Sequence, residues 1–512
     1  MTYSKRNCII SGLIGGGLIL SLSAILTYLL SPYLIKYIVS QRLILSSPSS
    51  DVYSGWKLAP IPIYVKFYFF NVTNPSAIVA GTSEPILQEL GPYTFLEVRE
   101  KINVTWNHED GLVSYQQLAR YYPIPEMSVG SLNDSIFHLN VPLASMLSRA
   151  KRKDDDLVYG FIEQVAVGNG DDLFLKHTVG EILFNGYHDD LLDFIEGAGL
   201  SPVSVSPFSF FGNRNNTNTD GHFTIYSGEK GTLDKFGLIH SWNNERKLDI
   251  WNDAKCNSLE STWPGDLRPP YASNDLEEIK LFAPDLCRSL SLSYLTRKST
   301  KGVETIRYWA SPSLFDYSLQ KNKCYCLDSS CPPNGIFNTS ICTHGSPASI
   351  SFPHYLFADP VYTDNIQGLH PDPEKHIFYM DLEPNLGIPV ETKARIQVNM
   401  MLEKDDKVDF TENLTASVNL PIFWRETSAT IGDDLLSQLI LLQKHVPNII
   451  IIATFAQVAI AVALLVATLI CIIKMNTINE LVSRSSRPSK PFRHTRPSKK
   501  EYKTVMTTSF QN

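Results

Sequence analysis

The chain has 512 residues and a formal net charge of −7 at pH 7, and this charge is unevenly distributed. The segment 474–512 carries +7 and the pair Lys5 and Arg6 carries +2, which leaves −16 on the rest of the chain. An acidic majority of this kind excludes a nucleic-acid-binding protein, because such proteins present a basic face.

An apolar run of 23 residues without a charge, 8–30, lies near the start of the chain. It is longer than the apolar core of a cleaved signal peptide, about 7–15 residues, and no small-residue cleavage site closes it before Pro32. We predict a retained transmembrane helix over 8–30 and a cytosolic tail over 1–7. Gly12 and Gly16 form a small-xxx-small pair, which allows a homo-oligomer; the alternative is that glycine is simply common in membrane helices.

A second uncharged run extends from Ile449 to Ile473. A bilayer is spanned by about 20 apolar residues, so these 25 residues are sufficient, and we predict a transmembrane helix over 447–473. The tail 474–512 holds nine Lys or Arg residues and two Glu residues, and positive flanks stay in the cytosol. Both termini are then cytosolic, and 31–446 form an extracellular or lumenal domain.

The predicted extracellular segment carries six Asn-x-Ser/Thr sequons, none of which contains Pro at the middle position. Six such sequons in one segment and none in the tails indicate a glycosylated, extracellular or lumenal domain. The acceptor residues are Asn71, Asn103, Asn133, Asn215, Asn338 and Asn413.

The eight cysteines divide into two groups. Cys8 and Cys471 lie at the cytosolic ends of the predicted spans and are the kind of membrane-edge cysteine that is palmitoylated. The other six lie in one window of 87 residues, where an oxidising compartment favours three disulfides, although six cysteines allow many pairings. A zinc site is the rival, but the spacing of Cys324 and Cys326 is too tight for the usual zinc loop. The six are Cys256, Cys287, Cys324, Cys326, Cys331 and Cys342.

Most of the extracellular segment has the pattern of β-structure. Residues 63–72 are rich in aromatic and β-branched side chains, whereas 96–106 and 395–402 alternate apolar and polar side chains. We expect the polar side chains of such strands to face water, which suits the Asn103 sequon. No linker-like tract divides the roughly 415 residues, so we predict one large domain.

Helical patterns are concentrated in residues 141–199. Thr178 and Glu181 have the spacing of a capping box that opens a helix, with Gly186 as its weak point and an end at Gly197. Four apolar residues recur earlier at helical spacing, namely Leu157, Phe161, Ile162 and Val165.

The sequence contains no GxSxG, HExxH or phosphate-loop motif. His108, His354 and His376 have acidic or hydroxyl neighbours in the sequence, but we expect hydrogen-bonded structural histidines. We therefore predict that the chain is not an enzyme and holds no metal or cofactor.

Several short strings recur in order along the chain and cover nearly all of it up to the second span. They are RNC at 6–8, GPYTF at 91–95, Trp251 before Cys256, LCRS at 286–289, CYC at 324–326, PHYLFADP at 353–360, LPIFW at 420–424 and TIGD at 430–433. In this order they resemble the class B scavenger receptor family, the group of the fatty-acid translocase and the lysosomal integral membrane protein.

This resemblance implies an α+β fold, in which an irregular antiparallel β-barrel carries a helical apex, about 141–199, and encloses a hydrophobic tunnel. It implies that fatty acid, sterol, phospholipid or lipoprotein ligands bind at the apex and that lipid passes through the tunnel to the membrane. The helix bearing Leu157, Phe161, Ile162 and Val165 is then the candidate entrance. The implied disulfides are Cys256–Cys324, Cys287–Cys342 and Cys326–Cys331.

The apex differs from the basic apex of family members that bind anionic ligands. The basic residues 151–153 are followed directly by Asp154, Asp155 and Asp156, and 171–172 are acidic where lysines are expected. The resemblance therefore does not imply that this chain binds anionic ligands at its apex.

The alternative function is a protein-binding receptor for adhesion, phagocytosis or lysosomal delivery of a cargo protein. The predicted location is the plasma membrane, with the endosomal or lysosomal membrane as the alternative. Tyr502 and Val505 fit the Tyr-x-x-bulky pattern of endocytic sorting, which also arises by chance.

The predicted topology can be tested with epitope tags at the two ends of the chain. Protease added outside intact cells should leave both tags whole, because both termini are cytosolic, while glycosidase should reduce the mass of the segment between Val39 and His445. Loss of either tag in intact cells would refute the topology.

Overall fold

The structure is a computed structural model, and it describes residues 3–153, 156–169, 172–197, 206–271, 277–327, 330–343 and 345–485. The chain divides into two compact units. The two ends of the chain, up to Tyr33 and from Asn448, form the first unit, and Leu34–Pro447 form the second.

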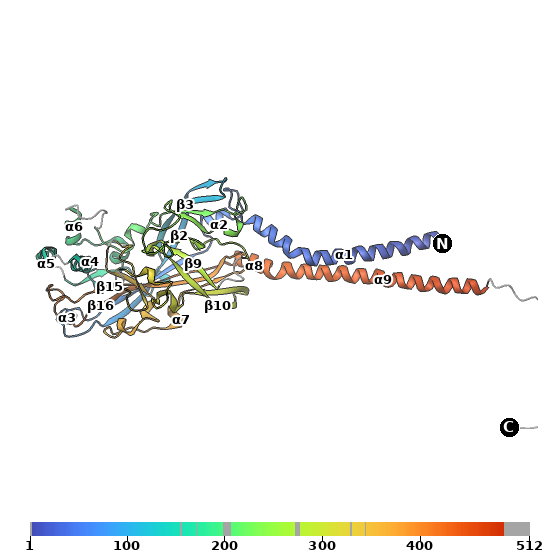
Figure 1. Cartoon of the computed structure of the whole chain (residues 1–512). Coiled ribbons are helices and arrows are strands. Elements are labelled where there is room, and N and C mark those ends of the chain that lie inside the picture. Colours follow the sequence, from blue (N-terminus) through green and yellow to red (C-terminus); the bar gives the residue numbers. More distant parts are fainter. Residues whose placement is uncertain are drawn as a thin grey trace, which may run out of the picture. The chain divides into compact units, whose positions relative to one another are not determined.

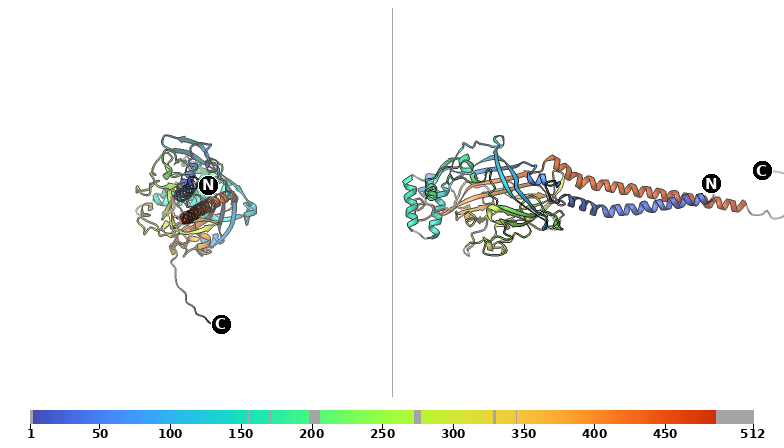
Figure 2. Two further views of the ribbon diagram at one scale, coloured as in Figure 1. Left: turned by 90° about the vertical axis from the view of Figure 1, so that its right-hand side faces the viewer. Right: turned by 90° about the horizontal axis from the view of Figure 1, so that it is seen from above.

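Two long apolar helices make up the first unit. They belong to α1 (Tyr3–Arg42) and α9 (Val446–Ser485), and both are long and apolar enough to cross a membrane. The helices lie side by side (Figure 2), and a Cβ added at Gly17 would approach the Leu465 side chain to 3.2 Å. The predicted glycine face is therefore used here, at Gly17, for packing within the chain. Gly12 has open space around it.

The described part of the second unit contains sixteen strands, most of which belong to one sheet. Their arrangement can be followed in Figure 1. Their bounds are β1 Ile63–Val72, β2 Leu87–Asn107, β3 Leu112–Pro123, β4 Ser135–Leu139, β5 Phe174–Thr178, β6 His222–Tyr226, β7 Ile239–Trp242, β8 Thr262–Trp263, β9 Glu278–Ala283, β10 Arg288–Thr300, β11 Val303–Trp309, β12 Ile336–Asn338, β13 Ala348–Ser351, β14 Tyr379–Leu382, β15 Pro389–Leu402 and β16 Val418–Thr430. The sheet order is β7-β6-β3-β2-β1-β16-β15-β14-β11-β10-β9-β8, with β13 also paired to β15 and β12 to β13.

The sheet curls into a nearly closed barrel. Its described pairs are antiparallel except β8 with β9. The strands at the two ends of the sheet order come close together. The ring centroid of Phe282 in β9 lies 5.2 Å from that of Trp242 in β7 and 6.2 Å from that of Phe223 in β6. The α+β barrel that the sequence predicts is thereby confirmed.

Three helices gather at one end of the barrel and form what we call the apical bundle (Figures 1 and 2). They are α4 (Val141–Lys153), α5 (Asp156–Asn169) and α6 (Asp190–Gly197), all within the predicted helical region. The remaining α-helices are α2 Tyr53–Lys57, α3 Pro75–Val79, α7 Pro373–His376 and α8 Asp433–Ile440. Short turns used below are η2 Glu181–Asn185, η3 Gly212–Arg214, η6 Pro284–Leu286 and η9 Pro353–Tyr355.

The predicted capping box at Thr178 and Glu181 is confirmed. The Thr178 amide donates to Glu181 Oε2 at 2.8 Å, and the Glu181 amide donates to Thr178 Oγ1 at 3.2 Å. One π turn, η2, follows and ends at Gly186, whose φ of 77° suits a residue without a Cβ. Because of this break, α6 begins as a separate helix at Asp190.

The first half of β2 is oriented opposite to the prediction. Glu97 and Lys101, expected to face water, are 6% and 1% exposed, whereas the apolar Leu96 is only half-buried. Each buried charge has a partner that offsets the cost of removing it from water. Arg99 donates to Glu97 at 2.9 Å, and Lys101 pairs with Asp266 at 2.8 Å.

A bulge between Ile102 and Thr105 restores the predicted orientation farther along β2. The extra residue shifts the two-residue alternation by one position. Beyond the bulge, Val104 and Trp106 pack against the barrel core as expected. Asn103 lies in the bulge with φ 54° and is exposed, so a glycan has room there.

The polar residues of β15 are also buried, but on the outer side of the sheet. Gln397 and Asn399 are fully buried where β13 pairs with β15. The Gln397 amide donates to Ser351 Oγ at 3.2 Å and to Asn399 Oδ1 at 2.7 Å, and its Oε1 accepts from the His354 amide at 2.6 Å. Since β13 and η9 cover this face, the alternating pattern marks a strand with two covered faces.

The six cysteines between Cys256 and Cys342 form two of the three predicted disulfides. Cys256 is bonded to Cys324, and Cys326 to Cys331. The third pair differs from the prediction, because Cys287 and Cys342 are free thiols in the structure. A hydrogen bond between these two side chains lowers the pKa of Cys287, so the sulfur atoms are already neighbours.

We propose that Cys287 and Cys342 form the third disulfide when the domain is exported. Loss of a native disulfide costs about 2–5 kcal/mol of folding stability, so Cys287→Ser should be retained in the secretory pathway. Mass spectrometry after alkylation should then find Cys342 modified in the variant and protected in the wild type. Modification of a different cysteine would contradict the pairing.

Candidate functional site

The apical bundle has its own apolar core. The three helices bury their apolar faces against one another, as amphipathic helices do. The core includes Leu143 and Leu147 of α4, Tyr159, Ile162 and Ala166 of α5, and Leu191, Leu192 and Ile195 of α6.

The predicted entrance residues on α5 separate into different roles. Ile162 is completely buried in the bundle core and Val165 is half-buried against it, so both pack the bundle. Phe161 is 38% exposed, and its ring lies 4.9 Å from that of Phe194 on α6, which is exposed as well. The Leu157 side chain lies outside the described residues. Phe161 is thus the predicted residue that the structure leaves accessible.

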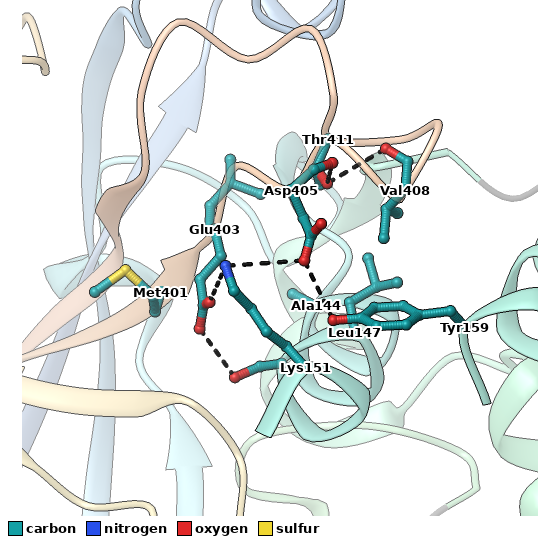
Figure 3. Close-up of a pocket in the computed structure, with 11 residues that line it drawn as sticks. Ala144, Leu147, Lys151, Tyr159, Met401, Glu403, Asp405, Val408 and Thr411 are labelled. Carbon is teal, nitrogen blue, oxygen red and sulfur yellow. Dashed lines mark hydrogen bonds and ion pairs between the residues drawn. The ribbon is translucent and has the colours of Figure 1, made fainter. Parts of the chain in front are cut away.

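A small cavity lies between the bundle and the end of β15 (Figure 3). It is lined by α4, by Tyr159 of α5 and by residues from Met401 to Thr411. Its volume is about 20 Å³, which is room for one water molecule and too little for an acyl chain. A lipid could enter here only after the helices move apart.

The charge of Lys151 beside this cavity is neutralised. Its ammonium lies 2.9 Å from Glu403 and 3.8 Å from Asp405 (Figure 3). The hydrogen bond to Glu403 raises the pKa of Lys151. The Tyr159 hydroxyl donates to Asp405 at 3.2 Å and joins α5 to the same group. This mixture of signs agrees with the sequence, which argues against a basic anion-binding apex.

Apolar packing continues from the bundle into the barrel. Phe208 packs against both the bundle core and the cluster inside the barrel, and Val141 and Ala144 of α4 belong to that barrel cluster. At its centre lie six rings that we call the aromatic wall, with neighbouring centroids 4.9 to 6.1 Å apart, mostly tilted or edge-to-face. The wall consists of Phe67, Phe69, Phe95, Phe184, Phe211 and Phe423.

A histidine pair lies where β4 and β5 meet the bundle. His138 Nε2 and His177 Nδ1 are 3.1 Å apart, and the His177 ring stacks on Tyr187. Burial lowers the pKa of His138 to about 4 and also lowers the pKa of His177. Both rings are therefore neutral near pH 7, as a contact between two imidazoles requires.

His354 in η9 and His376 at the end of α7, which the sequence suggests are structural, lie next to Trp424 of β16. His354 Nε2 is 2.6 Å from Glu89, and the indole of Trp424 donates to the same carboxylate at 2.7 Å. Burial would raise the pKa of Glu89, but these hydrogen bonds hold it below its usual value. His376 stacks on His354, with ring centroids 4.5 Å apart, and burial lowers its pKa to about 4. His108 instead pairs with Glu229 near the surface, at 3.0 Å.

None of these groups is arranged as a metal site within the described part of the chain, where no cluster of three or more His, Cys, Asp or Glu could hold an ion.

The predicted modification sites are spread over the chain. Asn103, Asn133, Asn215 and Asn413 are exposed, whereas Asn71 and Asn338 are half-buried. Cys471 is a half-buried free thiol on α9, Cys8 lies on α1 with its side chain undescribed, and Tyr502 and Val505 lie outside the described residues.

The sequence reasoning did not identify the aromatic wall or the charged residues beside it. Phe67 and Phe423 are far apart in the chain and meet because β1 pairs with β16. One feature of the sequence could have pointed to them. In Phe423, Trp424 and Arg425, a charged residue directly follows aromatic residues within a buried strand. Such a charge has to meet a partner inside the fold.

Comparison with known proteins agrees with this architecture. Scavenger receptor class B member 1 of Mus musculus is 30% identical over 476 residues, which cover 91% of this chain and 90% of the relative. Lysosome membrane protein 2 is 33% identical in Mus musculus and 31% identical in Homo sapiens, over 79% and 78% of this chain and 82% and 81% of the relatives. The model of the CD36 family matches residues 14–472. The resemblance seen in the short sequence strings is thereby confirmed, and the chain belongs to the CD36 family.

Proposed function

We propose that this chain is a scavenger-type cell-surface receptor that binds lipid or lipoprotein ligands at the apical bundle and passes lipid through the barrel to the membrane. Receptors of the CD36 family are not enzymes, and this chain has a binding role. The relatives named scavenger receptors support the class of function.

The observation that carries the proposal is the continuous apolar packing from α4 through Phe208 to the aromatic wall. An acyl chain following this route would leave water, and each buried methylene contributes about 0.8 kcal/mol. A long chain can therefore be held without a strong contact at the apex. That suits a bundle in which the charge of Lys151 is already neutralised by Glu403.

The second candidate is a receptor for a protein ligand, in adhesion, phagocytosis or lysosomal delivery. Its support is the exposed aromatic pair Phe161 and Phe194 on the bundle surface, since aromatic rings are enriched at protein interfaces. Lysosome membrane protein 2 among the relatives gives the lysosomal membrane equal standing with the plasma membrane as a location. Palmitoylation at Cys8 and Cys471 and sorting through Tyr502 and Val505 belong to the same proposal.

Phe161→Glu tests the entrance. Burying a phenylalanine contributes about 1.5–3 kcal/mol, so a charge here should lower uptake of labelled oleate and cholesterol about tenfold or more. Uptake would be measured in cells with equal surface expression. Gln164→Glu is the matched control, because it adds the same charge to an exposed position of α5 and should leave uptake unchanged.

A block inside the barrel separates passage of lipid from docking at the apex. Ala394 of β15 is half-buried against the barrel core, and Ala394→Trp would fill space there. We expect apical binding of lipoprotein particles to persist and lipid transfer to fall. If the variant reaches the surface and transfers lipid at the wild-type rate, the conduit is excluded and the protein-receptor function takes its place.

A further inference from the structure

A network of charged side chains lies inside the barrel next to the aromatic wall. We call it the arginine network, and it brings together strands and turns that are distant in the sequence. Its members are Glu97 and Arg99 of β2, Arg214 of η3, Asp220, Asp285 of η6 and Arg425 of β16.

Two groups of close contacts make up this network, and charge–charge interactions link them. Arg214 donates to Asp285 and lies 3.6 Å from Asp220, and Arg425 lies 3.7 Å from Asp285. Arg99 pairs with Glu97 at 2.9 Å. The positive charges of Arg99 and Arg425 act on Glu97 and lower its pKa although burial would raise it.

The carboxylates of the network are well supplied with donors. Both oxygens of Glu97 accept a hydrogen bond, one from Arg99 and one from the Tyr121 hydroxyl at 3.0 Å. Asp220 accepts from Gln117 at 3.1 Å on one oxygen and faces Arg214 with the other. Arg214 donates to one oxygen of Asp285, and the other oxygen faces Arg425 at an ion-pair distance of 3.7 Å, so every carboxylate of the network has a cationic partner.

The guanidinium groups, by contrast, have donors to spare. Each carries several N–H donors, and a structural ion-pair network would be expected to satisfy them. Arg99 donates one hydrogen bond, and its Nε is buried without a partner in the described part of the chain. The contact of Arg425 with Asp285, at 3.7 Å, is an ion pair without a hydrogen bond. The surplus calls for a further acceptor.

The network is deep in the protein and yet accessible. Water can reach 34% of the side-chain surface of Arg99 and 29% of that of Arg425. Burial and the charge of Asp285 raise the pKa of Asp220, which is therefore the carboxylate most readily neutralised. The three arginines and three carboxylates balance in formal charge, so a small anionic group that reaches this point is attracted by the unused N–H donors of Arg99 and Arg425.

The aromatic wall begins directly at the network. The Arg425 guanidinium lies 5.7 Å from the ring centroid of Phe211, which packs on Phe67 and Phe423. In the register of β1 with β16, Arg425 is opposite Phe67, and Phe423 is opposite Phe69. An apolar surface thus runs from the guanidinium towards the apical bundle.

We infer that the arginine network binds the anionic headgroup of a lipid whose acyl chain lies along the aromatic wall. A carboxylate or a phosphate fits, because both accept two parallel hydrogen bonds from a guanidinium. The inference rests on the proposed lipid-binding function and specifies where an anionic group is held, inside the barrel rather than at the apex.

The test uses the purified full-length chain in detergent micelles and three probes with one oleoyl chain. These are oleate, 1-oleoyl-lysophosphatidate and methyl oleate, which differ in headgroup charge. The wild type should bind at least one anionic probe about tenfold more tightly than methyl oleate, since a hydrogen-bonded charge is worth at least that factor. Preference for oleate or for lysophosphatidate identifies the carboxylate or the phosphate.

Arg425→Leu is the informative variant, because Asp285 keeps Arg214 as a partner and no carboxylate is left alone. It should lose about tenfold in affinity for the anionic probe and keep methyl oleate within about twofold. Arg425→Lys should retain most of the preference. Lys321→Met, which removes a surface ion pair with Glu278, should bind as the wild type does.

The possible outcomes distinguish failure of the headgroup site from failure of the proposed lipid-binding function. Binding of all three probes with equal affinity, or an equal loss of all three in Arg425→Leu and Arg425→Gln, would overturn the headgroup site and leave lipid binding intact. Failure of the wild type to bind any probe would overturn the proposed function itself. Thermal unfolding of each variant shows whether a loss reflects misfolding.

Discussion

The pairing of β1 with β16 is the interaction on which the interior of the domain depends. These strands come from opposite ends of the second unit, yet their register extends from Ile63 opposite Ala429 to Phe69 opposite Phe423. One face of the pair gives the interior Phe67 and Arg425. The other carries the stacked rings of Tyr68 and Trp424, 3.8 Å apart. Neither the aromatic wall nor the cluster around Glu89 would exist without this pairing.

Where strands of the sheet are covered on both sides, as β14 to β16 are over much of their length, their polar residues have to be satisfied by one another. Arg395 donates to Glu426 at 2.8 Å from one strand to the next beneath α7, and Asp381 accepts from Arg307 at 2.6 Å with no exposure of its own. Removing one member of such a pair leaves a buried charge and costs about 3–5 kcal/mol. The barrel is thus held together by polar contacts as well as by apolar packing.

The sequence predicts the elements of this fold better than their orientation. Neighbouring residues in the chain determine the apical helices, the capping box at Thr178 and the break at Gly186. Features of this kind can be predicted from a sequence. The alternation in β2 and β15 correctly indicates strands. It does not tell which face is inside, because a strand with two covered faces keeps its two-residue period. Glu97 and Gln397 were therefore expected in water and are buried.

The candidate sites also differ in whether local sequence patterns or long-range strand pairing determine them. Phe161 was reached from helical spacing together with the family resemblance, and its exposed ring agrees with a surface role, whereas its neighbour Ile162 packs the core. No spacing rule relates Arg99, Arg214 and Arg425, which meet only through strand pairing and the turns η3 and η6. Sequence reasoning can say that a charge in a buried strand needs a partner, but it cannot name that partner.

The order of chemistry along the barrel constrains what a conduit of this kind can carry. The apolar packing extends from the apical bundle to the aromatic wall, and Arg425 lies opposite Phe67, two residues along β16 from Phe423. A lipid with an anionic headgroup would therefore rest with its head at Arg425 and its acyl chain towards the helices. A neutral lipid would gain the aromatic wall but no headgroup contact. Under the proposed function, the barrel would therefore act as a holding site that selects lipids by their headgroup.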